Sequence, residues 1–323
     1  MNNDRENRVL VFDVTRYMIE DGPGIRTAVF FKGCPLRCRW CSNPFGLIAE
    51  PQIVYNENKC VKCLTCVNVC PEGAISYVDD AIVTNRSLCS ACGRCAQACL
   101  YGARALVGKW MSPSEIVQKV IKDAMFYRRG DGGVTLSGGE VLMQAGAAKK
   151  ILKMCREHMV DTAIETSAFA SWDTLESLLP HCNLVFVDLK HINPDAHQRL
   201  TGVRNEVILH NIRKLADYVV KAKAPRMILR LPTIPGLNND EKTMRETARF
   251  IASLPGPVEV NLLPYHPLGA GKYEMIDMVY GLNSLAPLEK SALHLYKEII
   301  DSCCHKCRCS AGGGEIAVRP VGR

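Results

Sequence analysis

Seventeen cysteines mark this chain of 323 residues, and fifteen of them fall into three short zones. In the middle zone, eight cysteines repeat the spacing C-x2-C-x2-C-x3-C twice. That run is typical of bacterial two-cluster iron–sulfur domains, in which the fourth cysteine of each run ligates the other cluster. It predicts two [4Fe–4S] clusters with crossed ligand sets: Cys60, Cys63, Cys66 with Cys99, and Cys89, Cys92, Cys95 with Cys70. Two zinc sites are the alternative, but zinc ribbons use paired C-x2-C knuckles rather than this run.

The first zone has a different spacing, C-x3-C-x2-C, formed by Cys34, Cys38 and Cys41. Three thiolates leave one iron of a [4Fe–4S] cube open to a small molecule, and an open metal position is what catalysis needs. For the triplet taken alone, a zinc site closed by a distant His or Cys remains an alternative.

The third zone gathers Cys303, Cys304, His305, Cys307 and Cys309 within seven residues. These groups suit a soft metal, but the run is tight for a tetrahedral cage, and a Gly-rich stretch follows. We therefore expect residues 302–323 to form a flexible tail with exposed thiols, so that cutting the chain after Asp301 leaves activity intact. The remaining cysteines, Cys155 and Cys182, stand in apolar patterns and are predicted to be ordinary buried thiols.

Composition narrows the class of protein. The chain is 47% hydrophobic and 23% charged, as in an ordinary globular protein, and no apolar run reaches the eighteen residues of a membrane span. The net charge of +7 is scattered rather than striped, so we expect no nucleic-acid partner. The N-terminus shows no signal-peptide pattern, so we expect a cytoplasmic protein with reduced, metal-binding thiols.

Short apolar runs alternate with helical patterns along most of the chain. Strands are predicted at 8–13, 27–32, 134–136, 162–164, 184–189, 227–231 and 258–263, and helices at 142–158, 194–217, 240–253 and 287–301. Ser112 and Glu115 form a capping box around Pro113, and Asn193-Pro194 is a second helix start.

This alternation predicts an α/β fold, a full or partial (β/α) barrel with active residues at the carboxyl ends of its strands. The cysteine-rich block is then a small inserted domain with two clusters. We divide the chain into residues 1–54 (first part of the barrel, with the triplet), 55–106 (insertion), 107–301 (remainder of the barrel) and 302–323 (tail).

Several motifs in this order resemble the glycyl radical enzyme activating enzymes of the radical S-adenosylmethionine superfamily. The resemblance covers roughly residues 8–285 and is closest to the subgroup with a two-cluster insertion. It rests on the cysteine triplet together with DGPGIRT (21–27), FKGC (31–34), TLSGGE (135–140), VDLK (187–190) and LLPYH (262–266).

The resemblance implies a set of site residues. Cys34, Cys38 and Cys41 would hold the catalytic cluster, and S-adenosylmethionine would bind its open iron. The cofactor contacts implied are Trp40, Cys41, Ser42, Gly138, Gly139, Glu140, Asp188, Leu189, Lys190 and His210. A monovalent cation near Asp188 would correspond to Glu165 and Thr166, although Glu165 departs from the shorter activators.

Taken singly, these motifs have plainer readings: a Gly-Gly-Glu turn, a buried Asp188–Lys190 pair, and a surface His210. Together with the triplet they imply reductive cleavage of S-adenosylmethionine to a 5′-deoxyadenosyl radical, which removes hydrogen from a glycine Cα of a glycyl radical enzyme. We expect a monomer that receives electrons from flavodoxin or ferredoxin. The inserted clusters either carry these electrons or only shape the docking surface, and the sequence leaves both roles open. An iron–sulfur electron carrier, or a radical enzyme acting on a small molecule, are the competing functions.

Overall fold

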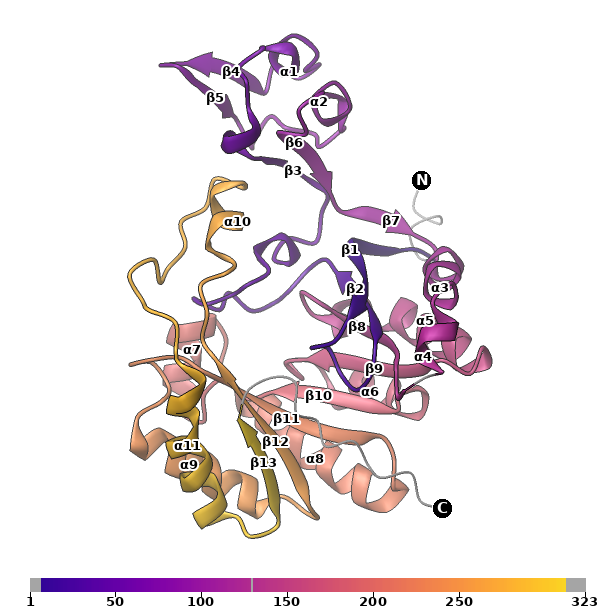
Figure 1. The fold of residues 1–323 in the computed structure, drawn as a ribbon, viewed down its shortest axis with the longest axis vertical. Coiled ribbons are helices and arrows are strands. Elements are labelled where there is room, and N and C mark those ends of the chain that lie inside the picture. The colour runs from indigo at the N-terminus through magenta and orange to yellow at the C-terminus, as the bar shows by residue number, and fades with distance from the viewer. Residues whose placement is uncertain (1–6, 129, 312–323) are drawn as a thin grey trace.

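A mostly parallel sheet organises the computed structural model, which describes residues 7–128 and 130–311 (Figure 1). Within these residues the sheet has nine strands in the order β13-β12-β11-β10-β9-β8-β2-β1-β7. Strands β2 and β8 to β13 run parallel, whereas β1 is antiparallel to both β2 and β7. Edge strands β13 and β7 each pair with one neighbour, so the predicted barrel is a partial one. The strands are β1 (Val9–Met18), β2 (Arg26–Phe31), β7 (Lys109–Met111), β8 (Gly133–Gly138), β9 (Asp161–Thr166), β10 (Leu184–Asp188), β11 (Arg226–Thr233), β12 (Val258–Pro264) and β13 (Cys307–Ala311).

Helices cover the outer face of the sheet. They are α3 (Pro113–Ile121), α4 (Ala124–Tyr127), α5 (Ala145–Glu157), α6 (Trp172–Glu176), α7 (Pro194–Thr201), α8 (Glu206–Ala222), α9 (Glu241–Ser253) and α11 (Leu293–Cys303). The capping box at Ser112 and the Asn193 cap are confirmed. The single helix predicted over 194–217 is wrong, because Gly202 adopts φ +84° and ends α7 before α8 begins.

The two faces of the sheet differ in character because side chains alternate along each strand. Outward-facing residues such as Leu136, Ile164 and Val187 are fully buried against the helices and form the main core. Cys155 and Cys182 lie in this core with 0% and 2% exposure, as predicted. No helix among the described residues is long and apolar enough to cross a membrane.

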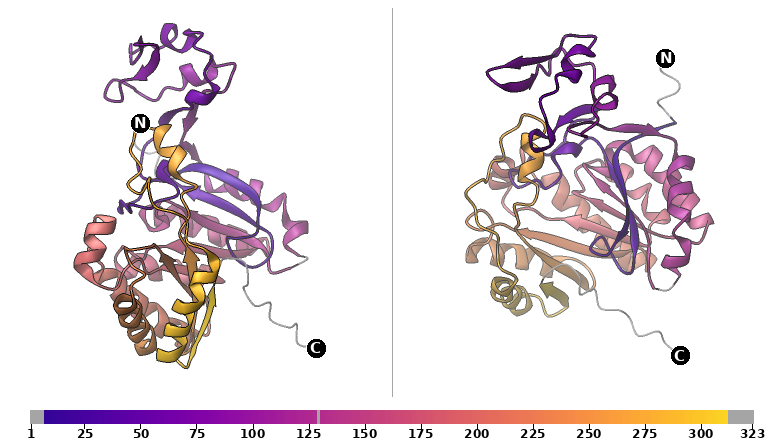
Figure 2. Two further views of the ribbon diagram at one scale, coloured as in Figure 1. Left: turned by 60° about the vertical axis from the view of Figure 1, so that its left-hand side comes forward. Right: turned by 45° about the horizontal axis from the view of Figure 1, so that its top comes forward.

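The insertion forms a separate head at the top of the molecule (Figures 1 and 2). Strands β3 (Gln52–Tyr55) and β6 (Arg104–Val107) pair antiparallel at its neck. Beyond them lie α1 (Thr65–Asn68), the hairpin β4 (Ile75–Val78) and β5 (Ala81–Thr84), and α2 (Arg94–Gln97). The neck begins at Gln52, three residues before the predicted boundary, because β3 must pair with β6 along its whole length.

The predicted flexible tail is wrong for residues 302–311, and residues 312–323 lie outside the described part. Helix α11 continues to Cys303, and β13 adds to the sheet in parallel with β12. Cys304 and Cys307 form a disulfide, and Cys304 is 2% exposed. Since the cysteines of this segment pack against the main core as apolar side chains, the segment is part of the fold. Cutting after Asp301 would therefore remove a sheet edge, contrary to our expectation.

Candidate active site

The loop of the cysteine triplet leaves the carboxyl end of β2 and is fixed on two sides. On one side, the N–H groups of Arg37 and Arg39 donate to the C=O groups of Thr201 (2.7 Å) and Leu200 (3.0 Å), at the end of α7. These bonds hold the middle of the loop against the carboxyl edge of the sheet, where barrel active sites lie.

Helix α10 (Ala270–Glu274) holds the other side of the loop. The Tyr273 hydroxyl donates to the C=O of Cys41 at 3.1 Å, and Lys272 Nζ donates to the C=O of Ser42 at 3.2 Å. The approach requires glycine at 269, because a Cβ there would lie 2.6 Å from Ser42 Cα. These contacts hold the backbone around Cys41 and Ser42 in place.

Trp40 anchors the loop through apolar packing. It is 9% exposed and packs in a cluster with Leu200, Ile234 and Tyr265. The predicted contact of Trp40 and Ser42 with an adenine therefore remains a prediction, with the Trp40 ring committed largely to the protein.

Burial makes the three thiols unusually weak acids. It raises the pKa of Cys34 and of Cys38 to about 12 and also raises the pKa of Cys41. The Lys190 ammonium opposes this rise at Cys38 and Cys41. The metal-free thiols are therefore protonated at neutral pH, and binding a cluster must release their protons.

Asp188 and Lys190 lie together at the carboxyl end of β10, as predicted. Lys190 Nζ donates to Asp188 Oδ2 at 2.8 Å. Burial alone would lower the pKa of Lys190, but Asp188 and Cys38 raise it above its usual value, so the group stays charged. Leu189 between them is 3% exposed and packs in the main core, which leaves only its backbone for a ligand. The side chains of Lys190 and Asp188 are 12% and 26% exposed, so the pair is mostly buried beside Cys38.

The Ser-Gly-Gly-Glu stretch ends β8 at the same edge. Gly138 has φ +113°, and a Cβ there would lie 2.3 Å from the Phe31 nitrogen, so only glycine fits between β8 and β2. The Glu140 carboxylate turns inward and accepts four hydrogen bonds: from Thr166 Oγ1 (2.6 Å), Ser167 N (2.8 Å), Ser167 Oγ (2.5 Å) and Leu142 N (3.1 Å). At 1% exposure, Glu140 therefore orders the edge of the sheet, and the cofactor contact predicted for this stretch is left to its backbone.

The eight cysteines of the head surround two small cavities. Cys60, Cys63, Cys66 and Cys99 line one of them, and Cys70, Cys89, Cys92 and Cys95 line the other. The structure thus brings together the two crossed sets that the spacing predicts. All eight are free thiols, and Cys63 and Cys92 are exposed.

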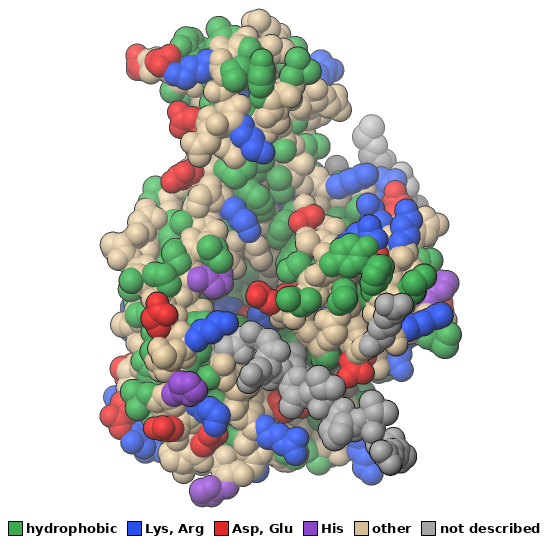
Figure 3. Space-filling view, viewed as in Figure 1, with side chains coloured by type: hydrophobic (Ala, Val, Ile, Leu, Met, Phe, Trp, Pro, Cys, Tyr) green, Lys and Arg blue, Asp and Glu red, His purple; other side chains and the backbone are tan. Residues whose placement is uncertain are grey.

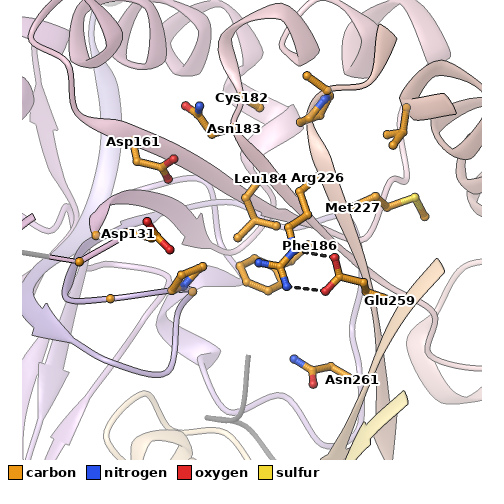
Figure 4. Close-up of a pocket in the computed structure, with 18 of the residues that line it drawn as sticks. Asp131, Asp161, Cys182, Asn183, Leu184, Phe186, Arg226, Met227, Glu259 and Asn261 are labelled. Atoms are coloured by element: carbon orange, nitrogen blue, oxygen red, sulfur yellow. Dashed lines mark hydrogen bonds and ion pairs between the residues drawn. The ribbon is translucent and has the colours of Figure 1, made fainter. Parts of the chain in front are cut away.

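The inner face of the partial barrel encloses a cavity of about 1500 Å³. Figure 3 shows this side of the molecule hollowed near its middle, and Figure 4 shows Leu184, Phe186 and Asn261 along the cavity. Arg226 and Glu259 form an ion pair inside it, with Nε and Oε1 2.6 Å apart (Figure 4). The cavity opens at the amino ends of the strands and reaches inward to Arg230, which lies beside Asp188.

Comparison with known proteins places this geometry in a family. The model of the Radical SAM superfamily matches residues 89–251, and that of a 4Fe-4S dicluster domain matches residues 52–100. The chain is 38% identical over 307 residues to the choline trimethylamine-lyase activating enzyme of Oleidesulfovibrio alaskensis, covering 93% of this chain and 96% of that protein. The chain belongs to the glycyl radical enzyme activating enzymes of the radical SAM superfamily.

Two further activating enzymes are equally similar. The isethionate sulfite-lyase activating enzyme of Oleidesulfovibrio alaskensis is 40% identical over 279 residues, covering 85% of this chain and 89% of that protein. The trans-4-hydroxy-L-proline dehydratase activating enzyme of Clostridioides difficile is 39% identical over 296 residues, covering 91% and 96%. The resemblance identified from the motifs is confirmed, and it extends over nearly the whole chain.

A monovalent cation, which the motif resemblance implies near Asp188, does not fit Glu165 and Thr166 as they lie here. Arg230 on β11 reaches across β10, above the ring of Phe186, and pairs with Glu165 on β9. Ser137 Oγ donates to the other Glu165 oxygen at 2.5 Å, and Thr166 Oγ1 donates to Glu140. Glu165 is therefore paired with a guanidinium and a hydroxyl of the protein itself, and the Thr166 hydroxyl is bound to the Glu140 carboxylate.

His210, a predicted cofactor contact, lies on a helix rather than at the carboxyl end of a strand. It lies on the exposed side of α8, whose buried side carries Ile208 and Asn211. His266 follows β12 at the carboxyl edge of the sheet, the edge at which Asp188 and Lys190 lie. Its signal was present in the LLPYH motif. Arg230 was missed altogether, because it stands inside an apolar strand and its partners lie on other strands.

Proposed function

We propose that this activating enzyme uses Cys34, Cys38 and Cys41 as the ligands of the cluster that cleaves S-adenosylmethionine. The observation that carries the proposal is the position of their loop, held from two sides beside the Asp188–Lys190 pair. Three thiolates fit a [4Fe–4S] cube with one open iron. When bound, the cluster supplies the electron that splits S-adenosylmethionine into methionine and the 5′-deoxyadenosyl radical that removes hydrogen from the partner's glycine.

The chain's own groups bind and orient the cofactor. The Gly138 and Gly139 backbone offers the close approach that the methionine amino group needs. Lys190 and Asp188 provide a fixed pair of charges beside Cys38, and His266 stands at the same edge. The buried Trp40 cluster shields one side of the loop from water, in keeping with the protein's role of orienting a cofactor that carries the chemistry.

The head holds two auxiliary [4Fe–4S] clusters in this proposal, giving three clusters in all. The segment after α10 joins the head to the catalytic loop: the Tyr55 N–H donates to the Met275 C=O at 2.9 Å, and Arg86 Nε donates to Asp277 at 2.6 Å. Because α10, directly before this segment, holds Cys41 through Tyr273, the head is coupled to the catalytic loop. We propose that electrons from flavodoxin or ferredoxin pass through the head.

The path is tested by replacing Cys63 and Cys92 with Ala. Both auxiliary clusters should be lost, and activation driven by the biological donor should slow, while dithionite-driven cleavage of S-adenosylmethionine persists. If iron analysis shows that both clusters are absent and the biological donor still drives activation at the wild-type rate, the head has only a docking role.

The partner is one glycyl radical enzyme, and we propose that a monomer of this chain acts on it in the cytoplasm. The three relatives above have nearly equal identity and activate different enzymes, so sequence similarity does not choose among them. The inner cavity of about 1500 Å³ is lined as far as Arg230, and we propose that the partner's glycine segment enters the protein through it.

The identity of the partner is tested with a panel. Choline trimethylamine-lyase, isethionate sulfite-lyase, trans-4-hydroxy-L-proline dehydratase and the glycyl radical enzyme encoded beside this chain are each incubated anaerobically with the reduced enzyme and S-adenosylmethionine. The neighbouring enzyme should give the glycyl doublet in electron paramagnetic resonance. Cleavage of S-adenosylmethionine without a doublet on any protein would favour a small-molecule substrate instead.

A further inference from the structure

Arg104 is buried between the two cavities of the head. It begins β6, is 3% exposed, and lines both the cavity of Cys60, Cys63, Cys66 and Cys99 and the cavity of Cys70, Cys89, Cys92 and Cys95. No other charged residue of the described chain lines both cavities. Its guanidinium is therefore the one fixed charge that both cavities share.

The Arg104 guanidinium uses only part of its hydrogen-bonding capacity. Nη1 donates to Thr84 Oγ1 at 3.0 Å, and Cζ lies 4.7 Å from the centre of the Tyr55 ring. Nε and Nη2 are buried and donate to no atom of residues 7–128 and 130–311. A buried cation without an anionic partner is costly, so these N–H groups require negative charge nearby. Clusters ligated by thiolates in the two cavities would supply it.

The internal repeat of the head shows that its fold does not need a charge at this place. Ala74-Ile75 follows the fourth cysteine of the first run at the same distance as Ala103-Arg104 follows that of the second. Ile75 begins β4 as Arg104 begins β6, and it is 5% exposed within the apolar core of the head. An aliphatic side chain therefore suffices at the repeat-equivalent position, and Arg104 carries a property beyond packing.

We propose that Arg104 compensates the charge of both auxiliary clusters, raising their reduction potentials and allowing both to be reduced together. The inference rests on the two clusters proposed above. Each cluster gains one electron on reduction, taken from the donor or from dithionite, and its negative charge grows by one. A fixed positive charge in a site of low dielectric constant favours that reduced form, and net charge and hydrogen bonds near the sulfurs are established determinants of cluster potential.

The test measures potentials rather than activity. Replacing Cys34, Cys38 and Cys41 with Ala gives a background in which only the auxiliary clusters are seen, with about eight irons. In it, Arg104→Gln removes the charge while keeping a donor for Thr84, and Arg104→Lys keeps the charge. Arg94→Gln is the matched control, because Arg94 precedes Cys95 but is exposed to solvent. Potentiometric titration with dithionite, followed by electron paramagnetic resonance, gives the midpoints and the spin–spin coupling of the two reduced clusters.

Arg104→Gln should lower the equilibrium constant for reduction at least tenfold, which is 59 mV for a one-electron couple, and weaken the coupled signal of the doubly reduced state. Arg104→Lys should keep most of the wild-type potential, and Arg94→Gln should leave it unchanged. Eight irons with wild-type potentials in Arg104→Gln would overturn the role of Arg104 alone. If Arg104→Gln does not bind its clusters, Arg104→Lys should still have the same potentials as the background protein without Cys34, Cys38 and Cys41. Loss of iron from Arg104→Lys as well would show that the shape of the side chain, and not its charge, matters. Failure of the parent itself to hold eight irons would overturn the auxiliary clusters as well.

Discussion

Replacing Glu140 with Gln tests whether this residue orders the sheet edge or touches the cofactor. Its carboxylate accepts four hydrogen bonds, two of them from the backbone N–H groups of Leu142 and Ser167, and it is 1% exposed. The glutamine amide keeps one acceptor oxygen. Its NH₂ group replaces the second oxygen and faces two groups that are themselves donors. At least one buried N–H then loses its acceptor whichever way the amide turns.

The cost follows from the bonds lost. A hydrogen bond to a charged group contributes about 1.5–3 kcal/mol, so losing two lowers the free energy of unfolding by about 4 kcal/mol. For a chain of this length, with an unfolding entropy of roughly 2 cal/mol/K per residue, the midpoint falls by about 6 °C. Thermal unfolding of the cluster-loaded protein, followed anaerobically by circular dichroism, measures this shift.

Matched variants separate the two roles. Glu157→Gln makes the same change at an exposed position of α5 and should stay within about 0.5 kcal/mol of wild type. Ser167→Ala combined with Glu140→Gln should cost less than the sum of the single changes, because the bond from Ser167 Oγ to the carboxylate is affected by both. If Glu140→Gln unfolds like wild type but no longer binds S-adenosylmethionine, the carboxylate contacts the cofactor and the positioning role is refuted.

Three further predictions follow from other parts of the structure. The wild-type rate of S-adenosylmethionine cleavage should be the same in sodium, potassium or a large organic cation. The Arg230→Met variant should cleave more slowly and depend on small cations, whereas the control Arg226→Met should not. A wild-type rate that depends on the cation would contradict the conclusion that Glu165 binds no monovalent cation. In thermal unfolding, truncation after Asp301 should lower the melting midpoint and truncation after Ala311 should not. Equal midpoints for the two truncated chains would show that residues 302–311 do not contribute to the fold. Burial, with help from Glu165, raises the pKa of Asp21 to about 7, so the folded state binds a proton that the unfolded state has released, and stability should fall from about pH 4 towards pH 7. Asp21→Asn should flatten that fall in melts across the same range, and an unchanged pH profile would exclude the shift.

Much of this site was predictable because its chemistry is encoded by local spacing. The two crossed ligand sets in the head follow from runs of a dozen residues, and the structure gathers them around two cavities. The strands were found for a similar reason, since a run such as LVFVD of β10 is buried on both faces. Asp188 and Lys190 then lie at the carboxyl end that any parallel strand presents.

The features that the sequence analysis missed depend on contacts between distant elements. The pairing of Arg230 with Glu165 spans three strands and 65 residues, so no local pattern reports it. The inward turn of Glu140 is decided by Thr166, the last residue of β9, and by Ser167, which follows it. At the C-terminus, the cysteine-rich composition of 302–311 concealed a strand, because cysteine packs as a small apolar residue when it is buried.

The most direct test of the account is the product formed from S-adenosylmethionine. Anaerobically reconstituted enzyme, reduced with dithionite and given S-adenosylmethionine, should release 5′-deoxyadenosine and methionine in equal amounts, and replacing Cys34, Cys38 and Cys41 with Ala should abolish both while leaving the irons of the head in place. No 5′-deoxyadenosine from the wild-type enzyme with its clusters loaded, or equal amounts from the triple variant, would contradict the assignment of these three cysteines to the radical chemistry.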